Sequence, residues 1–138
     1  MAEVARSGVS EAGLQKQIRD SLTVLGYTVM ETGKGRSRVQ CTRCGNRSYA
    51  TGWQGNTPGL PDLYIHRDGW ESVAVAVELK TDKGKPSDAQ RWLASRGITT
   101  ICRSLADVLR LLIIVERRWG NESHAVKLNS VLEVNGWT

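Results

Sequence analysis

The sequence predicts an α/β domain in which a mixed sheet is flanked by helices. Three segments repeat apolar residues at the three- and four-residue spacing of a helix, and each follows a serine that can cap its N-terminus (Ser10, Ser87 and Ser104). Short apolar segments bounded by turn signals alternate with these helices. The expected order is a helix, a meander of strands, a helix, a strand and a helix.

The first half of the chain supplies one helix and most of the strands. The helix is expected to run from Ser10 to about Leu25, where Gly26 ends it. Its apolar face consists of Leu14, Ile18, Leu22 and Leu25. The expected strands are, in order, 27–30, 38–40, 48–53, 63–66 and 73–80. The last two are joined by a turn that the Asp68–Gly69 pair marks.

The second half adds two helices and one strand. A helix is expected from Ser87 to about Arg96, with its apolar residues facing inward: Ala89, Trp92 and Leu93. A strand follows at 98–103. A long helix after Ser104 has an apolar face made of Leu105, Val108, Leu109, Leu112 and Ile113. The tail after Gly120 fits either a strand or a short helix.

Length and composition limit the class of protein. The 138 residues fit one domain, and the longest unbroken aliphatic run, at 111–115, is far too short to cross a membrane. No secretory signal is visible at the N-terminus. Three cysteines, an odd number, favour a reducing compartment, so we expect the cytoplasm. The net charge of +5 permits a nucleic-acid partner without requiring one.

Positive charge is concentrated in one glycine-rich segment. Between Glu31 and Asp62 the chain holds five basic residues and no acidic one: Lys34, Arg36, Arg38, Arg43 and Arg47. Cations of this kind can contact a phosphate backbone, although a solvated basic loop explains the charge equally well. Cys41 and Cys44 in the same segment have the spacing of half a zinc knuckle. A closed zinc site needs four ligands, so a pair of free thiols or a remnant knuckle is the preferred interpretation.

Acidic residues are expected to meet where two strands lie side by side. Alternation along 73–80 places Glu78 and Lys80 on one face with Ala74 and Ala76, and Val73, Val75, Val77 and Leu79 on the core face. The turn between the strands would bring Asp62 opposite or diagonal to Glu78, roughly 4.5–8 Å away at Cβ. Carboxylates that close repel one another unless a cation such as Mg²⁺ or Mn²⁺ lies between them. Alternatively, Glu78 and Lys80 form a surface ion pair and Asp62 caps a turn.

Several stretches of the sequence resemble one nuclease family. They are "SEAGLQKQI" (10–18), "GLPD" (59–62), "VELKTDKGKPSDAQRWL" (77–93) and "GITTICR" (97–103). This chain is similar to the virus-type replication-repair nuclease (VRR-NUC) family of the PD-(D/E)XK superfamily over about residues 10–115. The resemblance implies a restriction-endonuclease-like core of order αβββαβ. It also implies a single domain over 1–138, with a basic glycine-rich loop at 31–57 and a tail at 120–138.

The resemblance also implies roles for individual residues. The metal ligands would be Glu11, Asp62, Glu78 and the backbone carbonyl of Leu79. Lys80 would orient or activate the attacking water and stabilise charge on the phosphate, and Gln90 would border the site. Lys85 and Arg91 flank this region and join the five basic residues of 34–47 as expected DNA contacts. Gln15, one turn beyond Glu11, fits a place at the site and an exposed position equally well.

The expected function is therefore that of a Mg²⁺- or Mn²⁺-dependent DNA endonuclease. The resemblance extends to Holliday-junction resolvases, which implies a structure-specific enzyme of DNA recombination, repair or phage replication. It would act as a homodimer in a bacterial or phage-infected cell. A flap or restriction-like nuclease of the same fold is the first alternative. A non-catalytic DNA-binding module is the second, and the presence of Asp62, Glu78 and Lys80 together argues against it.

Overall fold

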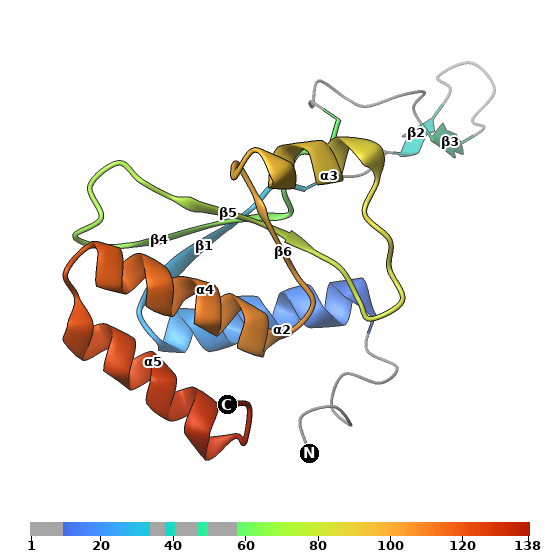
Figure 1. Cartoon of the computed structure of the whole chain (residues 1–138). Coiled ribbons are helices and arrows are strands. Elements are labelled where there is room, and N and C mark those ends of the chain that lie inside the picture. Colours follow the sequence, from blue (N-terminus) through green and yellow to red (C-terminus); the bar gives the residue numbers. More distant parts are fainter. Residues whose placement is uncertain (1–9, 34–37, 41–46, 50–57) are drawn as a thin grey trace.

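A four-stranded mixed sheet forms the centre of this α/β protein (Figure 1). The computed structural model describes residues 10–33, 38–40, 47–49 and 58–138. Its helices are α2 (Glu11–Val24), α3 (Asp88–Ser95), α4 (Leu105–Arg118) and α5 (Glu122–Val134). Its strands are β1 (Tyr27–Glu31), β2 (Arg38–Gln40), β3 (Arg47–Tyr49), β4 (Leu63–Arg67), β5 (Val75–Leu79) and β6 (Thr100–Cys102).

The order of strands in the main sheet is β1-β4-β5-β6. The first three pair antiparallel, and β6 pairs parallel to β5, so the predicted mixed sheet is confirmed. The connection between the parallel strands passes through α3, as a parallel pair requires. The remaining strands, β2 and β3, pair antiparallel with each other in a separate hairpin.

Serine caps begin three of the helices, as predicted. The side chain of Ser10 accepts a hydrogen bond from the backbone N–H of Gly13 at 3.0 Å. Ser87 and Ser104 each accept from the N–H three residues further on, at 3.2 and 3.1 Å. Each cap satisfies a donor that the first turn of a helix would otherwise leave without a partner, so the hydroxyls fix where these helices start.

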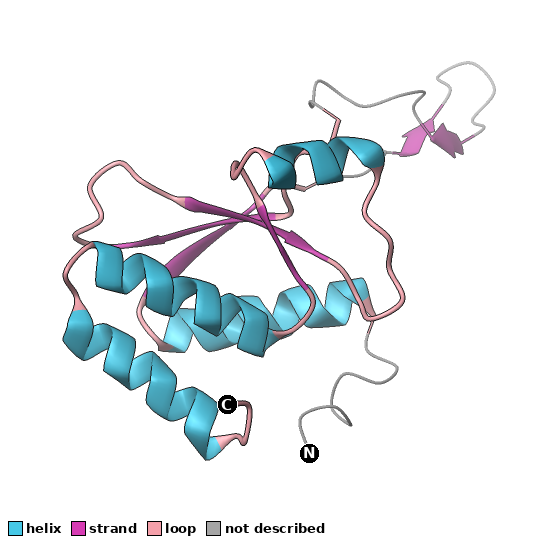
Figure 2. Ribbon diagram, viewed as in Figure 1, coloured by secondary structure: helices cyan, strands magenta, loops and turns pink. Residues whose placement is uncertain are grey.

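Two helices cover one face of the sheet, while α3 lies beyond the other (Figures 1 and 2). The apolar faces of α2 and α4 pack against every second residue of the central strands. The buried side chains of this core are Leu14, Ile18 and Leu22 of α2, Leu63 and Ile65 of β4, Val77 and Leu79 of β5, and Leu105, Val108, Leu109, Leu112 and Ile113 of α4. The predicted apolar faces of α2 and α4 are thus confirmed.

The tail is a helix, which decides between the two structures that the sequence allowed. α5 packs along α4 as an outer layer (Figure 1) and buries Ala125, Leu128 and Leu132. These residues recur at helical spacing, and the weak overall pattern reflects the exposed Val126 and Val134 beside them. Among the described residues, no helix combines the length and the apolar character that crossing a bilayer requires.

Two core predictions were wrong. Trp92 is 55% exposed, because α3, which the structure describes in full, buries none of its residues. The guanidinium carbon of Arg96 lies over the exposed Trp92 ring, 5.0 Å from its centroid. Val73 is 43% exposed, because β5 begins two residues later and position 73 belongs to the preceding loop.

A buried carboxylate links the sheet to the last two helices. Glu116 of α4 is fully buried, and its two oxygens accept hydrogen bonds from Tyr27 (2.7 Å), Arg67 (2.6 and 2.8 Å), Trp70 (3.2 Å) and Asn121 (2.9 Å). We call these five residues the Glu116 network. Burial alone would raise the pKa of Glu116, but these hydrogen bonds outweigh it and hold the pKa at about 2. The carboxylate is therefore ionised across the physiological range.

His124 lies next to the Glu116 network but does not supply positive charge to it. Its Nε2 lies 3.8 Å from a Glu116 oxygen. Burial and the charge of Arg67 lower the pKa of His124, so the imidazole is neutral at neutral pH. The positive charge that balances Glu116 therefore comes from Arg67.

Candidate active site

Asp62 lies directly before β4, and Thr32 forms hydrogen bonds with the backbone at this position. The hydroxyl of Thr32 donates to the carbonyl of Pro61 at 2.7 Å, and the N–H of Thr32 donates to the Asp62 carbonyl at 3.0 Å. The side chain accepts a hydrogen bond from the backbone N–H of Leu79 at 2.7 Å. This bond ties the aspartate to the neighbouring strand, so its position is set by the pairing of β4 with β5.

A glycine brings this loop into direct contact with α3. Gly59 has φ +83°, and a Cβ at this position would stand 2.9 Å from the Cβ and the backbone carbonyl carbon of Ala89. A residue with a side chain would therefore be strained and would collide with the helix. The Gly59–Asp62 segment depends on this close approach.

Glu78 is the second acidic residue of the site, and it comes from β5 in the sheet. Leu63 pairs with Val77, and continuing this antiparallel register places Asp62 opposite Glu78. The sequence predicted this juxtaposition. Glu78 is only 1% exposed, whereas isolated surface carboxylates are usually well solvated.

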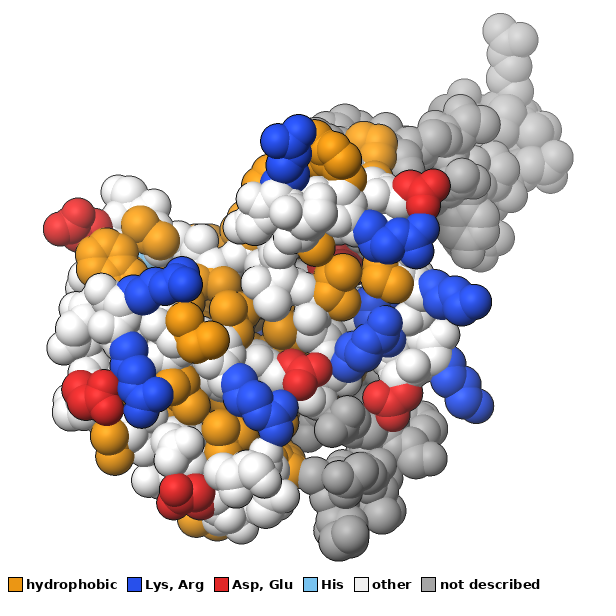
Figure 3. Space-filling view, viewed as in Figure 1, with side chains coloured by type: hydrophobic (Ala, Val, Ile, Leu, Met, Phe, Trp, Pro, Cys, Tyr) orange, Lys and Arg blue, Asp and Glu red, His pale blue; other side chains and the backbone are white. Residues whose placement is uncertain are grey.

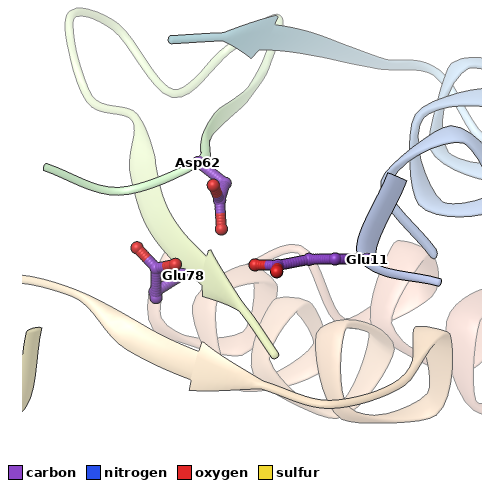
Figure 4. A group of neighbouring side chains, drawn as sticks. All are labelled: Glu11, Asp62 and Glu78. Atoms are coloured by element: carbon purple, nitrogen blue, oxygen red, sulfur yellow. The ribbon is translucent and has the colours of Figure 1, made fainter. Parts of the chain in front are cut away.

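Glu11 completes the acidic group from a different element. It is the first residue of α2, directly after the Ser10 cap, and its side chain is half exposed. Figure 4 shows the three carboxylates pointing toward a shared space. One oxygen from each of Glu11, Asp62 and Glu78 can be chosen so that all three lie within 4.8 Å of one another. Residues 67 positions apart in the sequence thus meet at the ends of a helix and two strands.

Lys80 lies between two of these carboxylates. Its Nζ is 3.9 Å from a Glu78 oxygen and 4.0 Å from a Glu11 oxygen, and its side chain is 15% exposed. The Lys80 N–H donates to the carbonyl of Cys102 at 3.0 Å, which extends the β5–β6 pairing by one residue. The ammonium group is therefore shielded from solvent and shared between two acidic partners.

This donor set fits a hard divalent cation. All three candidate ligands offer carboxylate oxygen, which Mg²⁺ and Mn²⁺ prefer. Three carboxylates and one ammonium leave a formal excess of negative charge within this group. Like charges at such distances repel each other unless a cation reduces the repulsion.

Two glutamines that the sequence associated with the site make local contacts. Gln90 accepts a hydrogen bond from the Ser87 N–H at 2.8 Å and so completes a capping box at the start of α3. Gln15 donates to Glu31 at 2.8 Å, which joins α2 to the end of β1. Both side chains are half-buried.

The predicted DNA-contacting residues fall in two groups. Lys85 is exposed in the loop from β5 to α3, and Arg91 is exposed on α3, where it forms an ion pair with Asp88. Figure 3 shows Lys and Arg side chains gathered along this side of the molecule. Arg38 and Arg47 belong to the β2–β3 hairpin. The others lie outside the described residues: Lys34, Arg36 and Arg43, together with the possible zinc ligands Cys41 and Cys44.

The third cysteine is buried in the sheet beside the site, with its thiol in the core. Cys102 of β6 is buried, and burial, with a smaller effect of Asp107, raises the pKa of its thiol to about 12. A thiol that stays protonated is a poor ligand and a poor nucleophile. Cys102 is therefore a core residue.

Arg103 contributes to this region and was not predicted. It follows β6 directly, and its guanidinium reaches the loop after Lys80. Its position was a usable signal, since residues that follow two neighbouring parallel strands meet at the same edge of a sheet. Comparison of the chain with family models, with curated proteins and with solved structures found no match.

Proposed function

We propose that this chain is a Mg²⁺- or Mn²⁺-dependent DNA endonuclease with a PD-(D/E)XK core of the VRR-NUC type. The observation that carries the proposal is the group of Glu11, Asp62, Glu78 and Lys80 at one edge of the sheet, with Glu78 buried. The order α2-β1-β4-β5-α3-β6, taken without the separate hairpin, is the αβββαβ order of that superfamily and supports the assignment.

The three carboxylates would hold the cation, in line with the resemblance of their sequence motifs. When bound, the ion supplies neutralisation of phosphate charge, activation of water and stabilisation of the leaving oxygen. In the hydrolysis itself, a water oxygen adds to phosphorus as the water gives up a proton, the bond from phosphorus to one sugar oxygen breaks, and that oxygen takes up a proton and leaves as an alcohol.

Lys80 is suited to two tasks in this reaction. Its shielded Nζ can donate hydrogen bonds to the attacking water and to a phosphate oxygen at the same time. Glu11 and Glu78 on either side orient the lysine while no substrate is bound. Lys85 and Arg91, exposed beside the site, would contact phosphates further along the strand.

A cleavage assay tests the proposal. Wild type is incubated with a four-way junction, a flap and a plain duplex in Mg²⁺ or Mn²⁺, alongside Asp62→Asn and Glu78→Gln. We expect cutting that EDTA abolishes and that both variants reduce by about 1,000-fold or more, equivalent to about 4 kcal/mol of transition-state stabilisation. Asp68→Asn, the same change in an exposed turn, should cut like wild type.

The substrates separate the alternatives within the proposal. Preferred cutting of the junction would support a resolvase-like enzyme, which would work in the cytoplasm as a homodimer because two symmetric cuts need two sites. Preferred cutting of the flap or the duplex would favour the flap or restriction-like alternative. Salt-sensitive binding without metal-dependent cutting would refute the enzyme and leave a DNA-binding module.

A further inference from the structure

The loop that follows Lys80 is folded back onto this lysine. A tight turn covers 81–84, in which the N–H of Gly84 donates to the Thr81 carbonyl at 3.0 Å. A Cβ at Gly84 would stand 3.4 Å from the Cδ of Lys80 and equally close to the backbone nitrogen and the hydroxyl of Thr81. The turn therefore lies beside the aliphatic stem of the lysine, with little room between them.

Arg103 holds this turn in place. Its Nη1 donates hydrogen bonds to the carbonyls of Thr81 (2.6 Å) and Gly84 (2.9 Å), the first and last residues of the turn. Hydrogen bonds from a charged donor are stronger than those between neutral groups. One guanidinium thus fastens both ends of the turn that packs against Lys80.

The arginine is itself anchored to a rigid part of the fold. Its backbone N–H donates to the Asp107 carboxylate at 2.9 Å, in the first turn of α4. The preceding residue, Cys102, accepts the backbone N–H of Lys80 at 3.0 Å. Lys80 and Arg103 therefore follow two neighbouring parallel strands and lie side by side. Because Arg103 is bound to α4 and to the turn, it fixes the turn relative to the sheet and α4.

We propose that Arg103 is a positioning residue of the active site. It clamps the turn at 81–84 against Lys80 and so keeps Nζ between Glu11 and Glu78. This role rests on the proposed nuclease function. Arg103 acts through the lysine, so its loss should slow the reaction step and leave DNA binding nearly intact.

Kinetics give the first test. In Arg103→Gln we expect kcat to fall about 10- to 100-fold, because a small displacement of a reacting group has effects of that size. KM for DNA and its salt dependence should stay within about twofold of wild type. Arg110→Gln is the matched control, since Arg110 also contacts Asp107 (3.1 Å) but belongs to α4. A raised KM with unchanged kcat in Arg103→Gln would identify a phosphate contact and overturn the proposal.

A double-mutant comparison shows whether the arginine acts through Lys80. In a Lys80→Gln background, Arg103→Gln should cause little further loss of rate, because the group that it positions is already absent. An equal additional loss in that background would contradict the proposal. Arg103→Lys, which keeps the charge but lacks the planar fork, should recover only part of the rate.

A measurement without DNA separates this inference from the proposed function. NMR of the lysine ammonium groups, with the Lys80 signal assigned by Lys80→Arg, should show a protected Lys80 signal in wild type and in Arg110→Gln. The signal should be lost or averaged in Arg103→Gln while the melting temperature shows a folded protein. If wild type cuts no DNA, the nuclease proposal fails, yet this spectrum still decides whether Arg103 orders Lys80. An unchanged Lys80 signal in Arg103→Gln would refute the inference.

Discussion

Two buried glutamates of this protein lie in opposite electrostatic surroundings. Glu116 is surrounded by donors from four residues, and Arg67 balances its charge. Glu78 is equally buried but lies with two other carboxylates, and it shares the Lys80 ammonium with Glu11. The Glu116 network is a structural link, whereas the acidic group carries like charges whose mutual repulsion a bound cation would relieve.

Breaking the Glu116 network should have the largest effect on folding. Arg67→Ala leaves a buried carboxylate without its cation, and such changes lower the free energy of unfolding by about 3–5 kcal/mol. Urea denaturation at pH 7 measures it. The matched control is Arg117→Ala, whose partner Glu122 lies 3.1 Å away on the surface, where exposed pairs contribute about 0–1 kcal/mol. Similar losses in both variants would refute the special role of the network.

Acid should weaken the network in a defined pH range. The pKa of Glu116 is about 2 in the folded protein against an ordinary 4.5. Because the folded value is depressed, its contribution is complete above pH 4.5 and is lost as the pH falls toward 2. It amounts to about 3 kcal/mol. Urea titrations at several pH values should show the stability difference between wild type and Glu116→Gln shrinking over this range. Glu122→Gln should show no such trend, and a constant difference for Glu116→Gln would contradict the assignment.

Divalent cations should stabilise the acidic group independently of the network. At a Mn²⁺ concentration 100 times its Kd, the free energy of unfolding should rise by about 2.7 kcal/mol. Calorimetry with and without EDTA measures the effect. Asp62→Asn should remove it, while Arg67→Ala should keep it because the two sites share no partner. Stabilisation that survives in Asp62→Asn would mean that the cation binds elsewhere.

The smallest predicted change in the free energy of unfolding is an increase, opposite in sign to the effect of Arg67→Ala. In EDTA, Glu78→Gln should raise the free energy of unfolding by about 1–2 kcal/mol, because one of three mutually repelling charges is gone. The same change at Glu116 should lower it. If Glu78→Gln destabilises the metal-free protein as much as Glu116→Gln does, then the fold itself compensates both glutamates, and the contrast between the two regions disappears.

Local chemistry made much of this fold predictable. Each cap at Ser10, Ser87 and Ser104 involves one side chain and the backbone N–H three residues further on. The starts of these helices could therefore be predicted from the local sequence. The meeting of Asp62 and Glu78 followed from strand alternation and one tight turn. The prediction that Trp92 faces inward was wrong, because helical periodicity shows which residues share a face but not whether anything covers that face.

The Glu116 network shows what pattern analysis missed. Glu116 continues the apolar face of α4 at helical spacing from Leu109 and Leu112, so its place on the buried side was detectable. Its partners come from β1, the end of β4, the turn at Trp70 and the segment before α5. Trp70 follows the Asp68–Gly69 pair at the turn, where exposed residues are common, yet it is fully buried. Contacts between residues far apart in sequence leave no periodic trace.

The close approach of Gly59 to Ala89 links the position of the active-site loop to that of α3. Gly59 lies so near the helix that there is no room for a side chain between them, and Asp62 follows three residues later. A side chain at position 59 would therefore push the loop and the helix apart and shift the aspartate relative to its partners. Ala89 fills the space that a side chain at position 59 would need. A change at either position is therefore expected to require a change at the other.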